Sequence, residues 1–412
     1  MRKLGKPSAL AAAVALSLTL PTSPGAHASS FVDDASGSLQ LRNFYFNRDF
    51  RDTGARPQAE EWAQGFIFRG KSGYSHGDQG LGLDVHAALG LKLASDDDHA
   101  GTALLPNALG DEGPNSYSHI TFTAKAKISE TELKVGGLTP AVPVLQASDI
   151  RLLPQTYTGA ALTMNEVSGL ALQAAQLREF NQLNSTNRED MIANIGGTSD
   201  RFNYYGGAYT FPTQSPESTT LGLWRGDLDG VYDQNMINLL HNMSLGDWKL
   251  GANLAYFDSD IEAGNTDNKM KSVMLSAGTG PHTFRLGYQH SDGESAFPYI
   301  ALSNPYIANY IQILDFGRPD EKSWQARYDL DFASLGLPGL KGLVRYVSGD
   351  NINIAGSDAD KEWERDIDFT YTVQNGPLKN VSVQWRNAMV RSDVLGAVDE
   401  NRLILNYTIA LK

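Results

Sequence analysis

Basic side chains recur along this sequence at positions that alternate with apolar ones. Arg386 shares its parity with Gln384, whereas Val381, Val383 and Trp385 have the opposite parity. The same alternation sets further basic residues opposite an apolar face: Arg42, Arg48, Lys125, Arg285, Arg327 and Arg402. A guanidinium group binds a carboxylate through two parallel hydrogen bonds. A row of such side chains could therefore pass a small organic anion from one contact to the next.

The elements that position these side chains are expected to be strands with one apolar face. In residues 402–412, Leu403, Leu405, Tyr407 and Ile409 share one parity, and the polar residues Arg402, Asn406 and Thr408 lie on the other. Similar segments of about ten residues recur, which is typical of strands that cross an outer membrane in a closed barrel. A charge facing lipid at the midplane would cost about 2 to 4 kcal/mol, so the basic residues are expected to face the lumen.

Eight segments are predicted to be the clearest strands, and residues 168–183 suit either a strand or a helix. The strands are residues 81–93, 120–128, 248–257, 284–289, 324–331, 367–373, 381–389 and 403–411. No low-complexity linker separates them. We therefore expect one all-β domain, a transmembrane antiparallel barrel.

The N-terminus has the pattern of a secretory signal peptide. Arg2, Lys3 and Lys6 precede an apolar run at residues 8–20, and Ala-His-Ala follows at 26–28. The run is too short to remain comfortably as a membrane anchor. We therefore divide the chain into a cleaved signal peptide, residues 1–28, and a barrel domain, residues 29–412. Cleavage would move the formal net charge from -13 to -16.

The composition is compatible with an exported barrel. The mean hydropathy is -0.31, but a barrel strand needs only half of its residues to be apolar. The 40 glycines fit many tight turns, and the 17 tyrosines and 16 phenylalanines fit interfacial aromatic girdles. The chain has no cysteine, which excludes disulfides and thiol chemistry.

Closure of the barrel would make the first and last strands neighbours, so that Arg42, Arg48, Arg386 and Arg402 share one wall. With tilted strands each residue climbs roughly 2.5 Å. Arg42 would lie near the periplasmic third, Arg386 near the middle, and Arg48 and Arg402 near the outer third. We expect a ladder of positive charge that guides anions, with acidic residues mainly in surface loops. The alternative is neutralisation of each arginine by an inward carboxylate, for which the candidates are Asp84, Asp329, Asp331, Asp366 and Asp368.

The sequence carries little sign of a catalytic or metal site. There is no His-Glu-x-x-His and no phosphate-cradling glycine loop. Gly-x-Ser-x-Gly occurs once, at residues 73–77, where a predicted strand follows rather than the helix that follows a nucleophilic serine. None of the eight histidines has a recognisable metal-ligand spacing. We therefore predict no enzyme activity, no metal, no cofactor and no nucleic-acid partner.

Four segments resemble the OprD family of outer membrane channels: residues 31–51, 151–156, 321–330 and 399–407. The run Lys-Ser-Trp-Gln-Ala-Arg-Tyr-Asp at residues 322–329 is highly specific. The resemblance implies a barrel of about 18 strands in the outer membrane of a Gram-negative bacterium. It also implies selective uptake of small carboxylates. The chain is more similar to the branch associated with aromatic and other organic acids than to the basic amino acid branch.

The same resemblance implies that Arg48, Arg151, Arg386 and Arg402 belong to a basic ladder along the pore. Prolines break the segment around Arg151, residues 140–154. In the family this segment is an inward-folded constriction loop, and a plain surface loop is the alternative.

Residues 299–319 would form a second constricting loop, in which Tyr306 and Tyr310 are candidate pocket contacts. Gln384 and Ala59 stand where further ladder arginines can occur in the family. The ladder is therefore expected to be sparser and the affinity weaker.

Two other function classes remain open. A non-selective diffusion porin would share the fold, and relative solute flux would separate it from a selective channel. An outer-membrane hydrolase would need a nucleophile at the top of the lumen and would retain catalysis in detergent. The expected partners are outer membrane lipid and lipopolysaccharide, small carboxylate solutes and the barrel assembly machinery. We expect a monomer, with a weak oligomer left open, although the chain ends in Lys412 rather than in the aromatic residue that usually signals assembly.

Overall fold

The computed structural model of the protein describes residues 28–51, 57–107, 110–111, 113–213 and 217–412. The predicted signal peptide lies outside the described residues except for Ala28, where a short helix, α1 (Ala28–Asp33), begins. No helix in the described ranges has the length and apolar character needed to span a membrane.

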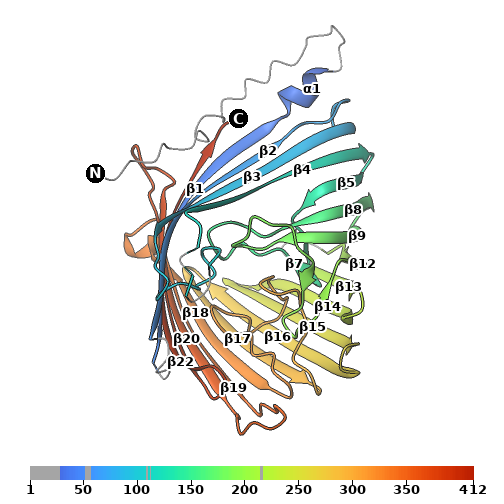
Figure 1. Cartoon of the computed structure of the whole chain (residues 1–412). Helices are drawn as coiled ribbons and strands as arrows, with labels where there is room; N and C mark the ends of the chain where they lie inside the picture. The colour runs from blue at the N-terminus through green and yellow to red at the C-terminus, as the bar shows by residue number, and fades with distance from the viewer. Residues whose placement is uncertain (1–27, 52–56, 108–109, 112, 214–216) are drawn as a thin grey trace, which may run out of the picture.

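Eighteen strands form one antiparallel sheet, which closes because β1 pairs with β22 (Figure 1). They are β1 (Ser36–Phe50), β2 (Gln58–Lys71), β3 (Gly80–Ala94), β4 (Ser116–Ile128), β5 (Thr131–Leu138), β8 (Thr156–Val167), β9 (Leu170–Asn181), β12 (Phe202–Phe211), β13 (Ser218–Leu228), β14 (Tyr232–Leu245), β15 (Trp248–Ile261), β16 (Thr266–Thr279), β17 (His282–Asp292), β18 (Lys322–Asp331), β19 (Leu340–Asp350), β20 (Glu362–Thr372), β21 (Ser382–Ser392) and β22 (Gly396–Ala410). The short elements are β6 (Ala141–Val142), β7 (Leu145–Gln146), β10 (Met191–Ile192), β11 (Thr198–Ser199) and the 3-10 helix η1 (Phe332–Leu335).

The predicted all-β barrel is confirmed, and all eight predicted segments fall on strands. Most of these strands extend beyond the predicted bounds. The ambiguous segment 168–183 contains strand β9, which pairs with β8 and β12. Leu172 and Ala174 share the exposed parity of β9, whereas Leu177 on the other parity is buried. The period is therefore two rather than 3.6.

The outer wall carries exposed apolar side chains. Leu81, Phe122 and Leu286 are 66%, 54% and 63% exposed, and the residues flanking each of them along the strand are less exposed. This pattern fits a strand face in contact with lipid. It fixes the polar parity of β3, β4 and β17 toward the lumen.

The two ends of the barrel differ in the lengths of their connections. Residues 129–130, 168–169, 246–247 and 280–281 make short turns at one end, called here the turn end, where β1 begins and β22 finishes. The opposite end, called the loop end, carries the longer connections. Two of these matter most, the β5–β8 loop (residues 139–155) and the β17–β18 loop (residues 293–321).

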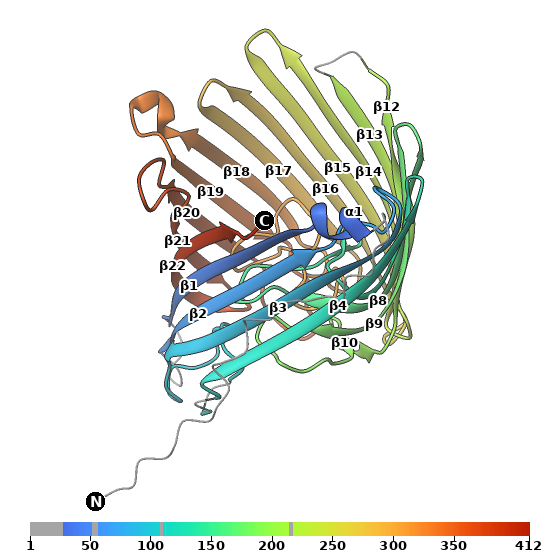
Figure 2. The same cartoon turned by 90° about the horizontal axis from the view of Figure 1, so that it is seen from above.

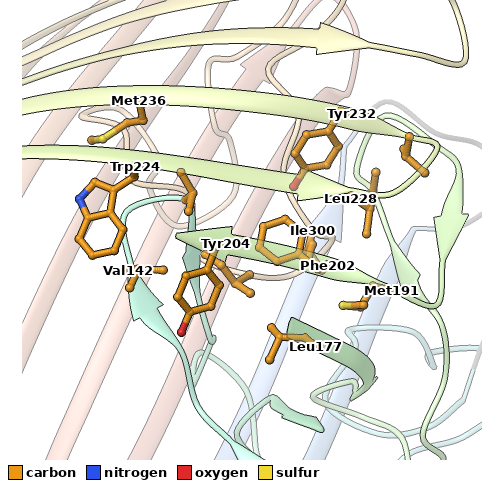
Figure 3. Close-up of a cluster of buried hydrophobic side chains, with 14 of the residues drawn as sticks. Val142, Leu177, Met191, Phe202, Tyr204, Trp224, Leu228, Tyr232, Met236 and Ile300 are labelled. Carbon is orange, nitrogen blue, oxygen red and sulfur yellow. The ribbon is translucent and has the colours of Figure 1, made fainter. Parts of the chain in front are cut away.

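Both of these loops fold into the barrel, as the view from above shows (Figure 2). Val142 from the β5–β8 loop and Ile300 from the β17–β18 loop join one buried apolar cluster with Phe202, Trp224 and Met236 of the wall (Figure 3). Burial of these side chains holds the loops against β9 and β12–β15. The predicted inward constriction loops are thus present. The β17–β18 loop also packs against the opposite wall, where Leu314 and Phe316 join a buried cluster with Val347 of β19, Val390 of β21 and Val398 of β22.

Candidate functional site

The β5–β8 loop reaches across the lumen to the wall that contains β1. Its residues Leu152 and Leu153 are buried in a second apolar cluster with Phe44 and Ile67. Arg42 of β1 secures this end of the loop.

The Arg42 guanidinium donates to the backbone oxygen of Arg151 at 2.7 Å. It also forms two hydrogen bonds to the Asp149 carboxylate, at 2.7 and 3.0 Å. The Arg42 side chain is only 8% exposed. Arg42, predicted as a ladder residue, therefore fastens the constriction loop and presents little surface to a solute.

Three guanidinium groups surround the ring of Phe46. Arg48, Arg151 and Arg402 lie 5.3, 5.2 and 4.6 Å from its centroid. Cations are attracted to the face of an aromatic ring. Glu400 is fully buried and pairs with Arg48 at 2.6 Å and with Arg402 at 2.5 Å. One carboxylate thus pairs with two of the three arginines. Phe46, Arg48, Arg151, Arg402 and Glu400 are called the Phe46 cluster below.

Arg151 forms no ion pair with a carboxylate within the described part of the chain. Its Nε donates to the backbone oxygen of Thr102 at 3.2 Å, and its Nη1 donates to that of Ile150 at 3.2 Å. Burial, and then the neighbouring charge of Arg402, lower the pKa of Arg151 to about 9. The group still carries its charge at neutral pH. It adds positive charge to the Phe46 cluster.

The register of β17 to β1 aligns inward-facing side chains, most of them charged, in two rows. We name these two rows the arginine stripe. The first row is Arg48, Glu400, Ala388, Asp366, Arg345, Arg327 and Arg285. The second row, two residues nearer the turn end on every strand, is Phe46, Arg402, Arg386, Asp368, Leu343, Asp329 and Thr283. Six arginines from the wall thus meet four carboxylates.

The arginine stripe descends through the lumen. Arg48 lies two residues from the loop end of β1, and Arg285 lies three residues from the turn end of β17. Because barrel strands tilt, a row perpendicular to them changes height from strand to strand. The stripe therefore leads from one mouth of the barrel toward the other.

Carboxylates accompany the arginines along the whole stripe. Arg386 pairs with Asp368 at 3.0 Å and Arg345 with Asp366 at 2.6 Å, while Arg285 and Arg327 both pair with Asp329. The expectation that acidic residues lie mainly in surface loops is wrong for this wall. Three of these pairs join neighbouring strands, whereas Arg327 and Asp329 both lie on β18.

Exposure divides the predicted ladder into reachable and covered arginines. The side chains of Arg285, Arg327, Arg386 and Arg48 are 31%, 25%, 22% and 21% exposed. That of Arg402 is 1% exposed, and it donates to the backbone oxygen of Gln312 in the β17–β18 loop at 3.2 Å. Arg402 is therefore covered by the β17–β18 loop and stabilises the site without contacting a solute.

The remaining predicted residues lie apart from the stripe or beside it. Lys125 on β4 pairs with Asp84 at 2.6 Å and is 7% exposed. Tyr306 packs against the apolar cluster of Figure 3, and the ring centroid of Tyr310 lies 6.5 Å from that of Tyr299. Among the described residues, no group of three or more His, Cys, Asp or Glu side chains is arranged to hold a metal ion.

Arg345 is the stripe residue that the sequence prediction missed. It lies on β19 between Val344 and Tyr346, which are 43% and 37% exposed. This alternation of apolar and basic residues was the available signal. Asp149 was also missed, because its pairing with Arg42 depends on the path of the loop.

Comparison with known proteins places this geometry in context. Residues 29–411 match the model of the outer membrane porin, OprD family. Porin-like protein GalP of Pseudomonas putida is 40% identical over 408 residues, which cover 96% of this chain and 97% of that protein. Porin D of Pseudomonas aeruginosa is 34% identical, with 94% and 93% covered. The crystal structure of Pseudomonas aeruginosa OccK9 (OpdG) has a TM-score of 0.89 and 43% identity, with 93% of this chain and 100% of that chain covered. That of OpdK with vanillate, from the same species, has a TM-score of 0.86 and 40% identity, with 92% and 100% covered.

Proposed function

Because this chain belongs to the OprD family of substrate-specific outer membrane porins, we propose that its arginine stripe selects small organic acids during diffusion across the outer membrane. The relatives are channels rather than enzymes, which removes the hydrolase from consideration.

The observation that carries the proposal is the excess of arginine over carboxylate along the stripe. Its two rows hold six arginines and four carboxylates, and Arg151 adds another positive charge. Arg285 and Arg327 share Asp329 as their carboxylate partner. A solute carboxylate can therefore bind where the wall leaves guanidinium hydrogen bonds unfilled. Among the reachable arginines, Arg285 and Arg327 lie on adjacent strands, and one strand, β22, separates Arg386 from Arg48. Two strands, β19 and β20, separate Arg327 from Arg386, and Arg345 of β19 lies between them. A solute could therefore pass from one guanidinium contact to the next along the stripe.

Aromatic acids are the favoured class within this proposal. OpdK has a crystal structure with vanillate, and a BenF-like porin of Pseudomonas fluorescens is 39% identical with a TM-score of 0.88. In this chain, Tyr310 lies close enough to Arg151 and Arg402 for their charges to act on it. An aromatic ring beside guanidinium groups suits a benzoate-like solute.

Competitive flux tests this function. Liposomes that contain the purified protein are given benzoate and its uncharged amide, benzamide, at equal concentration. Faster benzoate entry is expected, and the difference should shrink as salt screens the stripe. Equal entry of acid and amide would refute the selective channel.

The close pairing of arginines with carboxylates favours one alternative, a non-selective diffusion porin. A neutralised wall would discriminate only by solute size. The same flux assay separates the two functions. We further propose cleavage of residues 1–28 on export, and contact of the outer wall with lipid and lipopolysaccharide.

A further inference from the structure

We propose that a cavity on a different wall from the arginine stripe is a second binding site, specific for small hydroxylated carboxylates. The cavity has a volume of about 390 Å³ and is lined by residues of β2–β5, β8, β9 and β12. Thr139, Pro140 and Ala141 of the β5–β8 loop border it. The cavity therefore lies beneath the constriction loop, and no residue of the stripe lines it.

Three basic side chains face this cavity: Arg69, Lys71 and Lys134. Arg69 donates to Gln40 at 2.9 Å, and Lys134 pairs with Glu132 at 3.0 Å. Lys71 is the last residue of β2, is exposed, and has no ion-pair partner in the described ranges. Positive charge in a concave site attracts anions.

The cavity contains one acidic side chain, Asp84, and it is already paired. Lys125 holds Asp84 at 2.6 Å. Asp149 approaches Arg69 only to 3.9 Å, and its hydrogen bonds go to Arg42. The cations of the cavity therefore exceed the carboxylates that could neutralise them, which favours a carboxylate ligand.

Two polar side chains at the cavity lack hydrogen-bond partners in the described part of the chain. Both ring nitrogens of His86 are unpaired, and so is Oγ1 of Thr156, whose residue is 1% exposed. His119 stacks on His86 with 5.5 Å between ring centroids, which fixes the plane of the ring. Buried polar groups are nearly always hydrogen-bonded in folded proteins. A bound solute with hydroxyl groups would satisfy both.

The residues that line the cavity also indicate that its ligand carries hydroxyl groups. Thr121, Thr123 and Thr163, together with Gln173, complete the polar part of the cavity. A hydroxyl group both donates and accepts, so it matches threonine and neutral imidazole partners. An acid with a bare alkyl chain would leave His86 and Thr156 unpaired and should bind less well.

This site rests on the proposed function only in that both use carboxylate solutes. Equilibrium dialysis of the full-length mature protein in detergent measures it directly, with gluconate and hexanoate as probes of equal carbon number. The wild type should bind gluconate at the cavity in addition to any carboxylate bound at the stripe. Lys71→Gln with Lys134→Gln should weaken gluconate binding about tenfold or more. Hexanoate binding should change much less, because hexanoate occupies the cavity poorly and binds mainly at the stripe.

Matched variants separate the two sites. Lys341→Gln removes an exposed lysine near the turn end of β19 and should bind gluconate as the wild type does. Arg386→Gln should also retain binding at the cavity. Thr156→Val keeps the side-chain shape and should weaken gluconate several-fold without affecting hexanoate.

Two outcomes would overturn the proposal. One is unchanged gluconate binding in the double lysine variant, and the other is an equal loss of gluconate and hexanoate. Because dialysis measures occupancy rather than transport, these outcomes are distinguishable from a failure of the benzoate and benzamide flux test.

Discussion

Replacing Arg386 by glutamine should weaken the recognition of organic acids without disturbing the fold. Arg386 pairs with Asp368 at 3.0 Å, but Asp368 also accepts a hydrogen bond from Nε2 of Gln384 at 2.8 Å. The carboxylate therefore keeps a partner after the arginine is removed. This matters because a carboxylate left buried without a partner would be strongly destabilising.

The magnitude follows from the contact that is lost. The Arg386 side chain is 22% exposed, so its guanidinium can reach a solute from the stripe. A hydrogen bond to a charged group contributes about 1.5 to 3 kcal/mol. Loss of that contact corresponds to roughly tenfold to hundredfold weaker binding of benzoate. Small-ion conductance should change much less, because the substitution scarcely alters the width of the pore.

Planar bilayers measure this change as the concentration of benzoate that blocks half of the chloride current. Arg365→Gln is the matched control, because Arg365 has the outward parity of β20 and donates to Asn387 on the outer face. Each variant removes one arginine, from β20 or from the adjacent strand β21. If the same concentration of benzoate blocked half of the chloride current in both variants, the assignment of Arg386 to the solute path would be refuted.

Three other substitutions probe the neighbouring parts of the molecule. Asp329→Asn should raise the anion-to-cation permeability ratio measured from reversal potentials, because two arginines share this carboxylate; an unchanged ratio would mean that both are shielded in other ways. Glu364→Gln should increase conductance and proteolysis of the β17–β18 loop, because Glu364 accepts backbone N–H groups of that loop at 3.0 and 2.8 Å. Leu286→Arg should lower the free energy of unfolding by about 2 to 4 kcal/mol in lipid vesicles, and a neutral effect would contradict the outward assignment of this 63% exposed residue.

The sequence was most informative where one face of a strand is apolar and the other polar. That condition holds for β3, β4, β17 and β18, where alternation predicted both the strand and the direction of its basic residue. It fails for β12, β13 and β14, which were not among the predicted strands. Their lumen-facing residues include Phe202, Trp224 and Met236, buried under the inward loops. Both faces of these strands mix polar and apolar residues, as Gln234 on the inner face and Asn235 on the outer face of β14 show, so there is no clear alternation to detect.

The prediction that acidic residues lie mainly in surface loops was wrong for a different physical reason. Parity showed that Arg386 and Asp368 both point inward, but it cannot show that they touch. Contact depends on strand register, which a single-residue shift would abolish. The covering of Arg402 by the β17–β18 loop likewise depends on a connection without periodic structure. Inward direction was therefore predictable, whereas pairing and exposure were not.

The ion pair between Arg48 and Glu400 joins the first strand of the barrel to the last. Until β1 meets β22, Glu400 lacks this partner and Phe46 lacks the guanidinium of Arg402. The Phe46 cluster is therefore completed only by the final step of assembly, when the sheet closes. A barrel arrested with an open seam would be leaky to every small solute. Correct closure and chemical discrimination are consequently acquired in the same event, so a mutation that slows closure would also delay the appearance of selectivity.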